Sequence, residues 1–60
     1  MREMEIQAYA KELYDAHGEK AVLEAAQKAR MYEEQGNAEE AKTWRHVEAA
    51  LKIMRGPKQG

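Results

Sequence analysis

The chain has no cysteine, no serine and no phenylalanine, and only one proline and one tryptophan among its 60 residues. Without cysteine it can form neither disulfide bridges nor thiolate metal sites, which stabilise many chains of this length. No apolar run exceeds three residues, so no segment is long enough to cross a membrane as a helix. The sequence shows no nucleophile motif and no glycine-rich phosphate loop. We therefore expect no enzyme activity, no cofactor and, since no signal peptide is recognisable, a cytoplasmic location.

What is present is mostly charge and alanine. The chain has ten basic and eleven acidic residues, which gives a net charge of −1, and 11 of its 26 hydrophobic residues are alanine. Ordering about 60 residues costs roughly 1.5 kcal/mol each. This cost nearly cancels the free energy that so small an apolar core gains by burying its surface. We expect a single helical domain over residues 1–55, a disordered tail over 56–60, and a homodimer in which two copies share one core.

Glycines divide the chain into three segments of similar length. Gly18 and Gly36 separate them, and Gly56 with the following proline ends the third. No alternating or β-branched run indicates a strand, so the sequence predicts an all-α fold with helices over residues 3–17, 19–35 and 38–55. Asn37, followed three residues later by Glu40, is typical of a helix N-cap.

The short connection at Gly36 predicts that the second and third helices form an antiparallel hairpin. Counting outward from this turn places Ala29 opposite Trp44 and Val22 opposite Leu51, so that large side chains face small ones. The same count about Gly18 pairs the first helix with the second, although Gly18 could also let the first helix pack on a partner chain. The predicted apolar faces are Ile6, Tyr9, Ala10, Leu13, Ala16 and His17; Val22, Ala25, Ala26, Ala29 and Tyr32; and Ala41, Trp44, Val47, Leu51 and Met54.

Three apolar side chains fall away from these faces. Met31 projects about 180° from Val22, Ile53 projects about 180° from Trp44, and Leu23 lies at the flank of the apolar face of its helix. Single exposed apolar residues are common, but several in so short a chain indicate a second buried surface. Leu23, Met31 and Ile53 are therefore the candidate oligomer interface, and a further protein partner is an open alternative.

A second hypothesis is nucleic-acid binding by a basic edge of the third helix. This edge carries Lys42, Arg45, Lys52 and Arg55, and residues 37–60 hold five basic and three acidic residues. A recognition helix has a similar charge pattern, but proteins that bind polyanions usually carry a basic excess overall. Nucleic acid is therefore the less favoured partner.

The two histidines, His17 and His46, lack the ligand spacing of a metal site, so no metal is predicted.

Two stretches of the sequence resemble known proteins. Residues 32–41 followed by Trp44 resemble the inter-helix turn of a single tetratricopeptide repeat, but no second copy of the unit is present. The whole chain resembles a family of small bacterial helical proteins of unknown function, of alphaproteobacterial type. The shared pattern is AKELYDAHG at 10–18, EQGNAEEA at 34–41, and WRHVEAAL running to RGP at 44–57. This resemblance implies a bacterial helical protein that ends naturally at Gly60, and it assigns no site residues.

Overall fold

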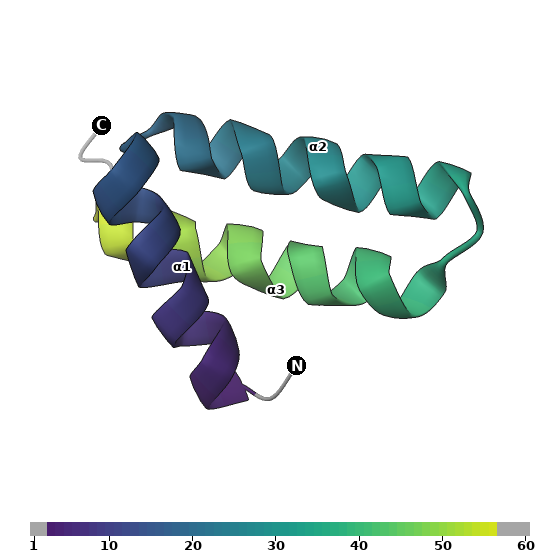
Figure 1. The fold of residues 1–60 in the computed structure, drawn as a ribbon, viewed down its shortest axis with the longest axis horizontal. Helices are drawn as coiled ribbons and strands as arrows, with labels where there is room; N and C mark the ends of the chain where they lie inside the picture. Colours follow the sequence, from purple (N-terminus) through teal and green to yellow (C-terminus); the bar gives the residue numbers. More distant parts are fainter. Residues whose placement is uncertain (1–2, 57–60) are drawn as a thin grey trace.

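A computed structural model describes residues 3–56, which form three α-helices and no strand (Figure 1). Helix α1 spans Glu3–His17, α2 spans Lys20–Glu34 and α3 spans Ala38–Arg55. The all-α prediction is confirmed, and α2 differs from the predicted range only because Glu19 and Gln35 are its capping residues. Residues 57–60, where most of the disordered tail was predicted, lie outside the described part of the chain.

The turn between α2 and α3 is closed by hydrogen bonds that use Asn37 twice. The Gly36 N–H donates to the Glu33 carbonyl at 3.1 Å, and the Asn37 N–H donates to the Tyr32 carbonyl at 2.8 Å. This is the Schellman pattern, and it requires the positive φ of 79° that Gly36 adopts. The Asn37 side chain then accepts a 3.3 Å bond from the Glu40 N–H and caps α3. Every residue of the connection thus helps to end α2 or to begin α3, and the turn is as short as the predicted hairpin requires.

Helices α2 and α3 lie side by side and antiparallel (Figure 1). Small side chains form the α2 surface of this hairpin, because Ala21, Ala25 and Ala29 are completely buried. Val22, a member of the predicted face, is only half-buried, whereas Ala21, which lay outside that face, is completely buried, so α2 is rotated relative to the prediction. Alanines at four-residue spacing let two helices approach closely, and this contact outweighs the burial of one valine.

Helix α1 crosses the hairpin end that is remote from the α2–α3 turn (Figure 1). Ile6 and Ala10 of α1 join a buried cluster with residues from both other helices, so α1 packs within its own chain. The buried members of the cluster are Ile6, Ala10, Ala21, Ala25, Val47 and Leu51, with Leu13, Tyr14, Val22, Trp44, Ala50 and Met54 packed against them.

The predicted face of α1 is wrong at its C-terminal end. Ala16 and His17 are exposed, whereas Tyr14, which bordered the predicted face, is half-buried. Tyr9, a member of the predicted face, contacts Trp44 of α3. The physical reason is the crossing geometry: Tyr14 is the last α1 residue that packs against the core, and Ala16 and His17 lie beyond that contact.

Candidate interaction surfaces

More large apolar side chains are exposed than buried in the described residues. The fully or nearly fully buried ones are Ile6, Val47 and Leu51, and every other buried residue is an alanine. The exposed ones are Met4 at 86%, Ile53 at 78%, Leu23 at 63%, Met31 at 39% and Tyr9 at 36% of their full accessible area. The structure thus exposes all three residues of the candidate interface, and it adds Met4 and Tyr9.

Leu23 and Ile53 do not belong to one surface. Leu23 is two residues from Ala25 and Ile53 is two residues from Leu51, and both Ala25 and Leu51 are completely buried. Two residues correspond to a rotation of about 200° around a helix, so both side chains point away from the α2–α3 contact. The outer sides of two paired helices face in opposite directions, so one flat interface cannot include both residues.

Trp44 lies at the junction of the three helices. The Tyr9 and Trp44 rings meet edge to face, with centroids 5.7 Å apart and an interplanar angle of 77°. From α2, the Lys28 ammonium lies 5.9 Å from the centre of the indole ring, within cation–π distance. The indole is only half-buried. It therefore holds α1 against the hairpin while part of its surface stays exposed to solvent.

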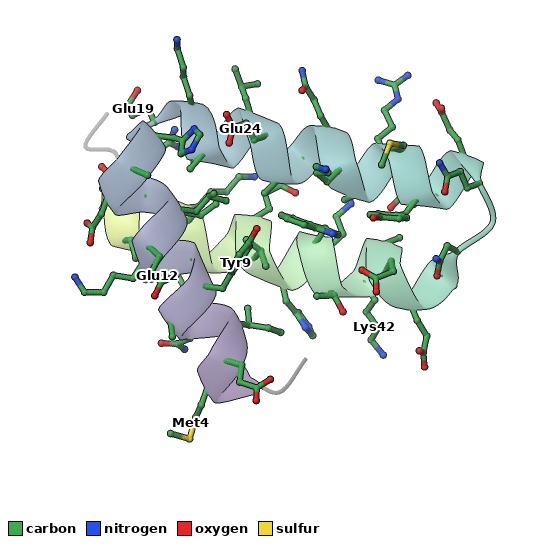
Figure 2. The ribbon with its side chains drawn as sticks, viewed as in Figure 1. Met4, Tyr9, Glu12, Glu19, Glu24 and Lys42 are labelled. Atoms are coloured by element: carbon green, nitrogen blue, oxygen red, sulfur yellow. The ribbon has the colours of Figure 1, made fainter. Side chains whose placement is uncertain are left out.

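Towards the α2–α3 turn, α1 no longer covers the hairpin (Figures 1 and 2). Met31 is one helical turn beyond Lys28, and Thr43 is one turn before the buried Val47, so both lie on the α1 side of their helices. We call this surface the turn-proximal face: Lys28, Met31, Thr43 and Trp44, bordered by Tyr9. Next to it, α3 borders a shallow hollow lined by Glu39, Glu40, Lys42, Thr43 and His46.

The four residues of the predicted basic edge lie in three different environments. Arg45 donates two 3.1 Å hydrogen bonds to the carboxylate of Glu33 on α2 and a third, at 3.0 Å, to Glu48. Lys52 contacts the other oxygen of Glu48 at 3.3 Å, so Glu33, Arg45, Glu48 and Lys52 form one ion-pair network. Lys42 lines the hollow described above. Arg55, in the last turn of α3, is exposed.

The hydrogen bonds and ion pairs of this network favour the charged forms of Glu33 and Arg45. The Arg45 hydrogen bonds hold the pKa of Glu33 below its ordinary value of 4.5. The same contact, followed by the one with Glu48, raises the pKa of Arg45. Two of the four residues proposed for binding phosphates are thus already engaged by carboxylates of the same chain.

The two histidines lie in separate places. His17 Nδ1 is 3.0 Å from a carboxylate oxygen of Glu24, a contact that links the end of α1 to α2. His46 is exposed beside the hollow on α3. Within residues 3–56, no group of three or more histidine or acidic residues is arranged to hold a metal ion.

The described helices allow the protein to be classified only by its architecture, which is a three-helix fold with an alanine-lined hairpin crossed by a third helix. Within the described residues, no helix combines the length and apolar character needed to cross a membrane. Comparisons of the chain with family models, curated proteins and solved structures found no match. The resemblances described from the sequence therefore stay predictions, and function has to be argued from the surface.

Proposed function

We propose that this chain is a small self-associating helical module that mediates protein–protein interaction. The observation that carries the proposal is the distribution of the large apolar residues: of those described, three are buried, six are half-buried and five are exposed. Folded chains keep most such side chains inside, because burying a leucine or isoleucine contributes about 1.5–3 kcal/mol. Five exposed ones are available to be buried by a second chain.

The size of the core supports the same proposal. Leu51 and Val47 are the largest completely buried side chains, and the alanines add little apolar area. A chain of this length stands near the limit at which one core offsets the entropy of ordering. Association adds buried apolar area without ordering further backbone. We extend the proposal to a two-fold dimer, the commonest symmetric assembly, located in the cytoplasm.

Sedimentation equilibrium over a range of protein concentrations tests this function. The expected result is a reversible monomer–dimer equilibrium, with a melting temperature that rises with concentration because folding and association are linked. A monomer at high micromolar concentration, with a melting temperature that dilution does not change, would overturn the proposal. Separation of cell extracts into cytosolic and membrane fractions tests the location.

The alternative, nucleic-acid binding through Lys42, Arg45, Lys52 and Arg55, has less support. Arg45 and Lys52 contact carboxylates, so binding a phosphate there would compete with existing ion pairs. The two functions differ in their response to salt, since phosphate contacts release counterions and apolar contacts do not. Fluorescence anisotropy of a labelled DNA duplex at two salt concentrations would detect such binding.

A further inference from the structure

We propose that the two copies associate by exchanging helix contacts: the outer side of α1 in each copy docks on the turn-proximal face of the other. This inference rests on the proposed self-association and names its surface. The turn-proximal face offers Met31, part of the Trp44 indole and the edge of Tyr9, while the outer side of α1 offers Met4. Three of the five exposed large apolar side chains are thereby used in one contact.

The first argument is the length of the hairpin that α1 leaves uncovered. Helices α2 and α3 contain 15 and 18 residues, which correspond to lengths of roughly 22 and 27 Å. A helix with its side chains is about 10 Å wide, so α1 covers less than half of the hairpin. The part left uncovered, on the side of the α2–α3 turn, has the width of one more helix.

The second argument is the outer side of α1. Met4 is two residues from the buried Ile6, so it points away from the core, and it is the most exposed large apolar residue (Figure 2). Ala8 follows Met4 by four residues and is also exposed, so the two share a face. One turn further, Lys11 and Asp15 form an ion pair at 3.6 Å that keeps the polar end of this face neutral. A long flexible side chain followed by a small one suits insertion beside an indole.

The third argument is charge. Helix α1 contains four acidic residues and one lysine, so it carries a net negative charge. Lys28 presents its ammonium group at the turn-proximal face, above the Trp44 ring. Glu39 and Glu40 line the hollow beside this face together with Lys42. The net negative charge of α1 is therefore attracted to the Lys28 side of the face, and this attraction favours one orientation of docking over others.

Symmetry and area fit a second copy of the chain. In a two-fold dimer each copy both inserts α1 and receives the partner's α1, so the contact is formed twice. A helix about 22 Å long and 10 Å wide has a footprint of about 220 Å². Two such contacts remove roughly 900 Å² of surface in total, which is the size of a weak, reversible association. The alternative residues, Leu23 and Ile53, lie on opposite sides of the hairpin and cannot form a comparable single interface.

Lysine substitutions with matched controls test the proposal. Met4→Lys and Met31→Lys each place a charge in the proposed contact, whereas Leu23→Lys and Ile53→Lys place it on other exposed sites. We expect the first two to raise the dimer dissociation constant by at least about tenfold, because an unpaired charge would be buried. The controls should change it by less than about twofold. Far-UV circular dichroism verifies that each variant keeps the helix content of the wild type.

Cross-linking supplies a second measurement, which the absence of natural cysteine makes specific. Chains carrying Met4→Cys are mixed with chains carrying Met31→Cys and treated with a short bismaleimide, and a Leu23→Cys chain replaces the second in the control. We expect mixed cross-linked dimers for the first pair and none for the control.

The results separate the two proposals. A wild-type chain that stays monomeric would refute both self-association and the helix exchange. A dimer that tolerates both methionine substitutions, or that is broken by Leu23→Lys or Ile53→Lys, would be consistent with self-association and would refute the proposed docking surface.

Discussion

Shortening two leucines to alanine gives a matched pair of perturbations with opposite expected results. Leu51 is completely buried, whereas Leu23 keeps 63% of its surface exposed. Leu51→Ala removes buried methyl groups and leaves a cavity, which costs about 3–5 kcal/mol. A domain of this size has a total stability of roughly 3–9 kcal/mol, so this loss is a large part of the whole. Leu23→Ala should cost less than about 1 kcal/mol.

Urea unfolding at one fixed protein concentration measures both losses. Far-UV circular dichroism follows the helices, and the emission of the single tryptophan, Trp44, follows the junction with α1. With a urea dependence near 1 kcal/mol per molar, as expected for so small a protein, Leu51→Ala should lower the midpoint by about 3–5 M or unfold the chain in water. Equal losses for the two variants would refute the reasoning, because they would place Leu23 in a buried contact of the assembly.

Other substitutions test the turn and the ion-pair network. Asn37→Ala should cost about 0.5–2 kcal/mol of unfolding free energy by removing the cap of α3, and Asn37→Asp should retain most of it. Gly36→Ala should cost about 1–2 kcal/mol because its φ of 79° is unfavourable for alanine. The lowered pKa of Glu33 means that its bond to Arg45 stabilises the fold above the ordinary pKa and is lost as the pH falls through the lowered one. Glu33→Gln should therefore be less stable than the wild type near pH 7, and urea titrations at about pH 3 should show the difference shrinking towards zero.

Helix number and helix ends could be predicted from the sequence because single residues determine them. Gly36 and Asn37 have a distinct conformational role at the turn, and the structure uses each in the expected way. The rotation of α2 could not be predicted as well. Its segment carries alanine at 21, 25, 26 and 29, and alanine is compatible with both the inside and the outside of a helix. Which alanines are buried is decided by how closely the neighbouring helix approaches.

The candidate surface was predictable only in part. Leu23, Met31 and Ile53 could be identified from their positions on a helix, and all three are exposed. Met4 was missed, although its spacing of two residues from Ile6 already placed it on the outer side of its helix. The contact between Tyr9 and Trp44 depends on the crossing of α1 over the hairpin. That crossing depends on side chains of all three helices, so no residue pattern within α1 alone specifies it.

The alanines of α2 have a consequence for how this protein can vary. Ala21, Ala25 and Ala29 have no accessible surface, so a larger side chain at any of them must push the helices apart, at a cost of about 1–3 kcal/mol. Glycine there would loosen the helix by roughly 1 kcal/mol. In a library of single substitutions, these three positions should therefore tolerate as few replacements as Leu51. The residues that contribute least side-chain volume are then among the most restricted in the chain.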